Sequence, residues 1–106
     1  MKSRRTKATD IPPKVKKEVE ERDHHTCIFC GSKDARGEAH YIRRSQGGLG
    51  IAQNLLTVCR VCHEKLDEGA DKEYYRKIAR EYLESKYPNW NEEDLIYNKW
   101  KGLKFQ

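Results

Sequence analysis

The sequence predicts one small α+β domain, in which a two-stranded hairpin and a helix are fastened together by cysteines and wrapped by further helices. Three observations predict it. Two Cys-x-x-Cys pairs, Cys27/Cys30 and Cys59/Cys62, are separated by the 28 residues 31–58. Apolar runs of strand character lie between the pairs, and apolar residues at helical spacing lie before and after them. The chain has 106 residues, enough for one domain, and 37% of them are charged, so its apolar core is modest.

The N-terminal segment, residues 1–10, has no apolar periodicity, and we expect a disordered basic arm there, followed by a single domain over residues 11–106. The first 17 residues contain seven Lys or Arg and one acid, a net charge of +6, so the rest of the chain sums to −1 within the total of +5. A basic arm on a nearly neutral body suggests an acidic polymer as partner, most simply nucleic acid. A solvated tail explains the charge equally well.

The next elements follow from apolar spacing. Apolar side chains recur every fourth residue from Ile11 to Val19, which predicts a helix over about residues 13–22 with proline in its first turn. Strand character predicts short strands over residues 38–42 and 55–58. The glycine-rich stretch between them, residues 43–50, is expected to be a loop.

Three helices are expected after the second strand. The first begins near Cys59 and ends at Gly69. The longest spans about residues 71–87, with Asp71 as its N-cap and Pro88 as its stop. Its apolar face consists of Tyr75, Ile78, Ala79, Tyr82 and Leu83. A short helix opens at residues 91–94 and carries Leu95, Ile96 and Trp100. We interpret these aromatic residues, together with Trp90, as the packing of a helical scaffold over residues 71–106 rather than as a platform for stacked bases.

The cysteines have two competing interpretations, disulfides and a metal site. No apolar segment follows the basic start of the chain, so we expect neither a secretory signal nor a membrane span, and a cytoplasmic location. In the cytosol, paired Cys-x-x-Cys motifs hold zinc more often than they form disulfides. We therefore expect Cys27, Cys30, Cys59 and Cys62 to bind a structural zinc ion.

His40, Asn54 and His63 lie between and beside the cysteine pairs. Hydrolysis of a phosphodiester near neutral pH needs a base for water and positive charge beside the phosphate and leaving-group oxygens. Histidine suits the first task and a divalent cation the second. His63 and Asp67 are four residues apart on the predicted helix, so both side chains can point to one ion.

Residues 38–48 (EAHYIRRSQGG) and 54–63 (NLLTVCRVCH) resemble the HNH endonucleases of the ββα-metal (His-Me finger) type that carry four flanking zinc cysteines. The matching core covers residues 27–67. The chain is also similar to small HNH proteins of bacteriophages and prophages in its overall size, its basic arm and its C-terminal helices. The resemblance implies a metal-dependent DNA endonuclease in the cytoplasm of a bacterial host cell, whose products carry a 5′-phosphate and a 3′-hydroxyl.

The resemblance also implies roles for single residues. His40 corresponds to the general base, and Asn54 to the residue that orients the base or assists at the metal. His63 corresponds to a ligand of the catalytic ion, Mg²⁺ or another divalent metal, and Asp67 falls where some members have a further histidine ligand. The flanking arginines, which would bind DNA phosphates, are Arg43, Arg44 and Arg60.

One position departs from the family. Many members have histidine or aspartate as a metal ligand immediately before the base, where this chain has Ala39. In an alternative register His40 is the ligand and Tyr41 the base, but the reference pKa of tyrosine, about 10, makes it a poor base. The Gly47-Gly48 pair supports the register with His40 as base.

Structural interpretations remain open for each residue. His40 can be an ordinary strand histidine, Asn54 a turn residue, and His63 a competitor for the structural zinc. Two other functions also remain open. One is a non-catalytic zinc-stabilised DNA-binding module, which Ala39 favours, and the other is an accessory subunit of a phage DNA-packaging or terminase complex. The His24-His25 pair precedes the first cysteines and is expected to be exposed, without a role at the site.

Overall fold

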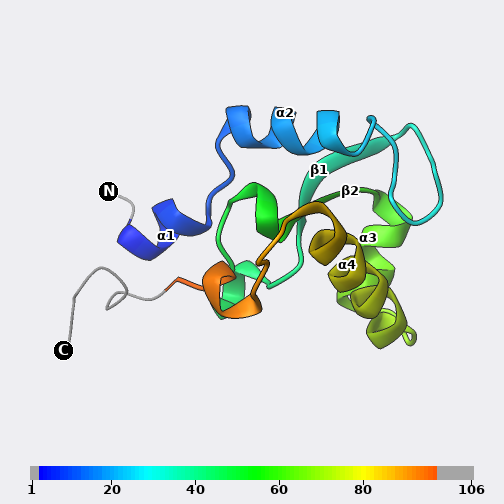
Figure 1. Ribbon diagram of the computed structural model, residues 1–106. Coiled ribbons are helices and arrows are strands. Elements are labelled where there is room, and N and C mark those ends of the chain that lie inside the picture. Colours follow the sequence, from blue (N-terminus) through cyan, green and yellow to red (C-terminus); the bar gives the residue numbers. More distant parts are fainter. Residues whose placement is uncertain (1–2, 98–106) are drawn as a thin grey trace.

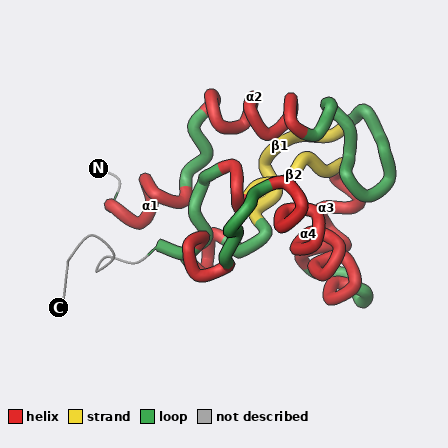
Figure 2. Tube along the Cα trace, in the orientation of Figure 1, coloured by secondary structure: helices red, strands yellow, loops and turns green. Residues whose placement is uncertain are grey.

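The structure is a computed structural model, and it describes residues 3–97. Figure 1 shows the order of its elements and Figure 2 their types. The elements are α1 (Arg4–Thr9), α2 (Pro13–Arg22), β1 (Ala35–His40), η1 (Arg44–Gln46), η2 (Ala52–Asn54), β2 (Leu55–Cys59), α3 (Arg60–Asp67), α4 (Lys72–Lys86) and η3 (Glu92–Leu95), where η denotes a 3₁₀ helix. Over the described range, none of the helices has the length and apolar character needed to cross a bilayer.

The two strands form an antiparallel hairpin at the centre of the domain. Its register runs from Ala35 opposite Cys59 to His40 opposite Leu55. The register shifts by one residue between Arg36 and Ala39, which marks a bulge in β1. The hairpin therefore carries Cys59 at one end and His40 at the other.

Helices cover the hairpin on two sides, as Figure 1 shows. Helix α2 lies along β1, and its buried Val19 packs against Leu55 of β2. On the other side lies the larger core, in which Leu56 of β2 meets Leu66 of α3 and Leu83 of α4, and all three side chains are fully buried. The expected α+β class, with flanking helices around a two-stranded sheet, is confirmed.

Several predicted bounds are confirmed and one strand is displaced. Helix α2 spans residues 13–22 as predicted, and α4 begins after Asp71 and ends before Pro88, although Asp71 makes no side-chain capping bond. Strand β1 begins and ends earlier than the predicted residues 38–42. After His40 the Tyr41 N–H still donates to the Asn54 carbonyl, but the Ile42 N–H donates to the Asn54 side-chain oxygen instead of to a backbone carbonyl.

The last expected helix is the short 3₁₀ turn η3, in which Asn91 accepts a hydrogen bond from the Glu93 N–H at 3.0 Å. Ile96 lies outside this turn and forms an isolated β-bridge with Gly48. The predicted packing residue Trp100 lies outside the described residues.

Residues 3–10 do not form the disordered arm that the sequence predicts. They contain helix α1, whose N-terminus is capped by the Ser3 hydroxyl, which accepts from the Thr6 N–H at 3.1 Å. Periodicity could not reveal this helix because it is only six residues long and buries only Thr9. Tertiary contacts stabilise it, since short isolated helices are marginal in water.

A buried ion pair, which the sequence analysis did not identify, joins α2 to the rest of the domain. The Arg22 guanidinium donates to the Leu55 carbonyl at 2.7 Å, and the Asp23 carboxylate accepts from the Thr57 N–H at 2.9 Å and from the Tyr82 hydroxyl at 2.6 Å. Burial raises the pKa of Asp23, but the hydrogen bonds from Arg22 and Tyr82 outweigh it and hold that pKa below its usual value. These bonds tie α2, β2 and α4 together.

Candidate metal centre and active site

The four cysteines come together as the sequence predicts. Cys27 and Cys30 lie on the turn that follows α2, Cys59 ends β2, and Cys62 lies in the first turn of α3. Their four sulfur atoms all lie within 4.8 Å of one another, and the Cys30 and Cys59 sulfurs are 3.6 Å apart. Tetrahedral zinc binds thiolates at about 2.3 Å, which places sulfur atoms about 3.8 Å apart. The cluster therefore fits a tetrahedral metal ion held by four thiolates.

The electrostatics of the cluster also fit a cation. Burial raises the pKa of the Cys27 thiol, but the backbone N–H groups of Cys59, Cys30 and Phe29 favour its thiolate and lower that pKa to about 7. Burial and the neighbouring thiols raise the pKa of Cys62. Four thiols this close cannot all ionise without a compensating positive charge, which a bound divalent metal supplies.

Asn54 lies behind the hairpin loop, fully buried. Its side-chain carbonyl accepts from the Ile42 N–H at 2.8 Å, and its amide nitrogen donates to the carbonyls of Ile42 at 3.1 Å and Leu49 at 2.9 Å. The side chain thus fastens the two ends of the loop that begins directly after His40. These three side-chain bonds all go to the loop backbone.

Gly48 allows the same loop to close. A Cβ at this position would lie 1.7 Å from the Ile42 carbonyl oxygen, so no other residue fits without moving the backbone. The Gly48 N–H donates to the Arg43 carbonyl at 2.8 Å. The predicted loop over residues 43–50 is therefore held closely against the end of β1.

His40 is at the last position of β1, and its side chain is turned toward helix α1. The residue is 8% exposed, and its ring Nε2 lies 3.0 Å from the Thr9 carbonyl oxygen. Burial lowers the pKa of His40 below its ordinary value, and the charges of Arg44 and His63 lower it further against the opposing effect of the Thr9 carbonyl. His40 is thus covered by the N-terminal segment.

His63 and Asp67 lie on the exposed side of α3. The His63 Nε2 is 3.2 Å from an Asp67 carboxylate oxygen, and both side chains are partly exposed. The predicted pairing on one helix face is confirmed. Within the described residues, the four cysteines are the only group of three or more His, Cys, Asp or Glu side chains close enough to share an ion as placed.

A polar cleft of about 340 Å³ lies beside His63. Two carboxylates that the sequence analysis did not identify, those of Asp34 and Glu38, line it together with Arg36, Val58, Arg60 and His63. The sequence position of Glu38, two residues before His40, could have indicated that it belongs to the site, because alternate residues of a strand share a face. Ala39 faces the opposite way and is fully buried in the core, so it contributes nothing to the cleft.

The three expected DNA-binding arginines are in different environments. Arg60 is the one beside His63, and its side chain is 93% exposed. Arg43 donates to the Asp67 carbonyl at the end of α3, and Arg44 forms an ion pair with Asp10. All three arginines therefore have a protein partner, since Arg60 forms an exposed ion pair with Glu64 at 3.8 Å, and Arg60 is the one that stays largely exposed at the cleft. His24 and His25 are exposed in the turn after α2, as expected.

No protein-family model and no solved structure matches the chain. A curated protein of Nostoc sp. (strain PCC 7120), named Anaredoxin, is 32% identical over 57 residues, which is 53% of this chain and 75% of that protein. The match therefore spans most of the relative and about half of the chain. With this identity over this share of the relative, the chain belongs to the same protein family as the anaredoxin of Nostoc.

Proposed function

We propose that this protein is a metal-dependent DNA endonuclease of the HNH type, with His40 as general base. The observation that carries the proposal is the arrangement of one hairpin and one helix. His40 ends β1, Asn54 fastens the loop after it, and His63 lies on α3, directly after the cysteine cluster that joins the two elements. The combination of base, positioning amide and metal ligand on a metal-fastened ββα unit supports phosphodiester hydrolysis.

In the proposed reaction His40 accepts a proton from water, and the resulting hydroxide attacks the phosphorus atom. The bond from phosphorus to the 3′ oxygen breaks, and that oxygen takes up a proton from solvent, which leaves a 5′-phosphate and a 3′-hydroxyl. A divalent ion, when bound, supplies positive charge for the phosphate and leaving-group oxygens. His63 and Asp67 would hold this ion, and the Glu38 carboxylate of the adjacent cleft offers a donor that Ala39 cannot.

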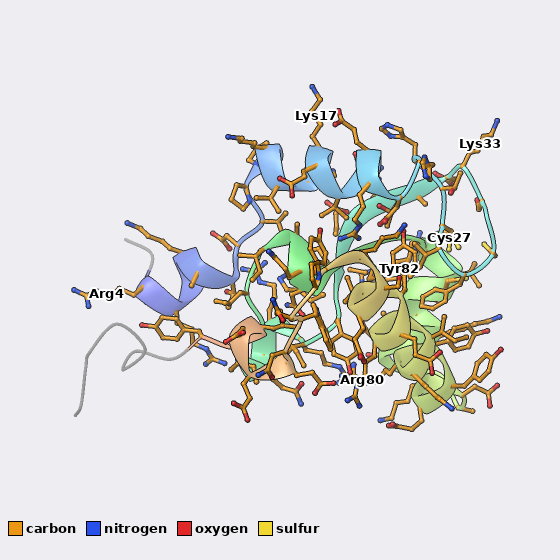
Figure 3. All side chains as sticks on the ribbon, viewed as in Figure 1. Arg4, Lys17, Cys27, Lys33, Arg80 and Tyr82 are labelled. Atoms are coloured by element: carbon orange, nitrogen blue, oxygen red, sulfur yellow. The ribbon has the colours of Figure 1, made fainter. Side chains whose placement is uncertain are left out.

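The charge distribution supports DNA as the substrate. The net positive charge of the chain lies in its first 17 residues, and Figure 3 shows Arg4 of α1 and Lys17 of α2 pointing away from the domain. Lysine and arginine that neutralise phosphates release counterions from DNA, so we expect the affinity to fall steeply as salt rises. Arg60, exposed at the cleft, would contact a phosphate near the reacting one.

A plasmid-nicking assay with Mg²⁺, Mn²⁺ or Ni²⁺ tests this function. We expect metal-dependent nicking that His40→Ala abolishes while the variant stays folded. His24→Ala is the matched control, because His24 is exposed and lies outside the motif, and it should nick like the wild type. Undiminished cleavage by His40→Ala would remove His40 from its role. If the protein binds DNA but does not cleave it in the presence of any of these metals, the result would support the non-catalytic binding module or the packaging subunit instead.

A second candidate is electron transfer at the cysteine cluster. The name of the Nostoc relative ends in "redoxin", which is used for small redox proteins. A cluster of four thiolates also suits iron as well as zinc. Metal analysis and the absorption spectrum of the purified protein separate the two functions, because iron–thiolate centres are coloured and zinc–thiolate centres are not. Stoichiometric zinc in a colourless, folded protein would exclude the electron-transfer role.

A further inference from the structure

We propose that a basic cleft between the hairpin loop and the start of α4 binds one backbone phosphate of the DNA substrate, near the phosphate that is cleaved. The inference rests on the proposed nuclease function and gives it a second contact with the substrate. The cleft has a volume of about 180 Å³ and is lined by Arg43, Gln46, Lys72, Glu73 and Arg76. Three cations and one carboxylate give this lining a net charge of +2.

The protein itself does not neutralise the positive charge of this cleft. Within the part of the chain that the structure describes, Arg43, Lys72 and Arg76 form no ion pair with a carboxylate. Arg44, the neighbour of Arg43 in the loop, is by contrast paired with Asp10. Side chains of one charge that gather in a cleft raise the local concentration of the opposite charge. The cleft therefore attracts an anion from outside the protein.

The two guanidinium groups of the cleft are held by contacts that leave donors free. Arg43 donates from Nη2 to the Asp67 carbonyl. The guanidinium carbon of Arg76 lies 4.9 Å from the centroid of the Tyr41 ring, which is buried. Because a guanidinium has five N–H groups, each arginine keeps donors for an oxyanion in a fixed orientation. The several oxygens of a phosphate can accept from both arginines and from Lys72 together.

The cleft is joined to the proposed active site through Asp67. The Asp67 carbonyl accepts from Arg43, and one oxygen of the Asp67 carboxylate lies 3.2 Å from the His63 Nε2. Arg60 is the first residue of α3, and Asp67 is the last. This length of helix measures about 10 Å, and the phosphates of one DNA strand follow each other at about 3.4 Å along the duplex axis. One strand can therefore contact Arg60 and the cleft while the cleaved phosphate lies between them.

A phosphate of the DNA backbone suits the cleft better than a free anion does. Gln46, Lys72 and Glu73 are exposed, so an isolated phosphate there would stay largely in water and close to a carboxylate. A backbone phosphate is linked to others that contact Arg60 and the basic N-terminal segment. Such linked contacts raise the effective concentration of each phosphate at its own site.

The experiment measures how tightly the full-length protein binds a fluorescently labelled DNA duplex, by anisotropy. No Mg²⁺, Mn²⁺ or Ni²⁺ is added, so the DNA stays intact. We expect the dissociation constant to rise about threefold in Lys72→Gln and in Arg76→Gln, the scale of one exposed charge contact. Lys77→Gln is the matched control, because Lys77 is an exposed residue of α4 outside the cleft, and its affinity should be nearly that of the wild type. Lys72 is exposed, so its variant keeps the test valid if Arg76→Gln fails to fold.

Two further measurements separate a phosphate contact from a general effect of charge. Glu73→Gln removes the carboxylate of the cleft and should strengthen binding about threefold, whereas Glu81→Gln, an exposed change on the same helix, should have little effect. The second measurement is the dependence of affinity on salt. In Lys72→Gln/Arg76→Gln the slope of log affinity against log salt should become shallower by about 0.9, the value for one phosphate contact.

Three results would overturn the inference. The first is a DNA affinity of Lys72→Gln and Arg76→Gln equal to that of Lys77→Gln. The second is saturable binding of inorganic phosphate that Arg76→Gln abolishes without a change in DNA affinity, because the cleft then serves a free anion. The third is a wild type that does not bind DNA, which would also reject the nuclease.

The inference and the proposed function can fail separately. If the wild type nicks DNA but the cleft variants bind it like their controls, the nuclease stands without this phosphate site. If the cleft variants bind DNA more weakly but no metal supports nicking by the wild type, the phosphate site stands and the nuclease fails.

Discussion

Asn54→Ala is the most direct test of how the hairpin loop is held. The side chain makes three hydrogen bonds to the backbone of Ile42 and Leu49, of which the two to Ile42 are buried and the one to Leu49 is partly buried. An intramolecular hydrogen bond contributes about 1 kcal/mol, so their loss should cost about 3 kcal/mol, and more if the buried groups stay unpaired. That is a large share of the total stability, about 5–15 kcal/mol, of a small domain.

The assay is thermal and urea unfolding of the metal-loaded protein, followed by circular dichroism. We expect Asn54→Ala to lower the Tm by about 12 °C or more, from the scale of about 4–8 °C per kcal/mol for a domain of this size. Gln53→Ala is the matched control, because this neighbouring side chain is exposed, and it should change the stability by less than about 0.5 kcal/mol. Indistinguishable unfolding of Asn54→Ala and the control would refute the structural role.

The same variant has an expected effect on function. Ile42, which Asn54 holds, is only two residues from His40, so a displaced loop changes the position of the proposed base. We expect nicking by Asn54→Ala to fall well below the fraction of folded protein at the assay temperature. A loss of activity that only followed the unfolded fraction would mean that Asn54 stabilises the loop without positioning His40.

Three further predictions concern stability. Tyr82→Phe removes the 2.6 Å hydrogen bond to the Asp23 carboxylate and should lower the free energy of urea unfolding by about 1.5–3 kcal/mol, because the partner is charged. The control Tyr74→Phe should leave that free energy almost unchanged, because Tyr74 is 63% exposed. The pKa of His40 is lower in the folded protein than the usual value of 6.5. As the pH falls through 6.5, the His40 ring therefore takes up a proton in the unfolded chain but not in the folded protein, which favours unfolding. Acidification from about pH 7.5 to about pH 5.5 should therefore lower the Tm of the wild type more than that of His40→Gln, and equal slopes would contradict the burial of the ring. Cys27→Ser should leave the chain largely unfolded, because a structural metal contributes folding free energy, and a well-folded wild type without bound metal would disprove this.

Local patterns in the chain predicted much of the fold. The helix over residues 13–22 has the expected bounds because its apolar spacing and its proline act within a few residues of each other. The cysteine cluster was predictable for a similar reason, since each Cys-x-x-Cys pair places two thiols on one turn wherever the turn lies. The displaced end of β1 was not predictable, because it depends on the side chain of Asn54, which is far along the sequence.

By itself the sequence determined the fold class and the four cysteines that gather in one cluster, because composition and short spacing carry that information. Only the tertiary structure decided what the residues of the motif face. It places Glu38 with His63 in one cleft, buries Ala39 in the core, and lays the carbonyl of Thr9 on the His40 ring. These contacts join segments up to several tens of residues apart, and their geometry depends on how the helices pack around the hairpin, which no local pattern encodes.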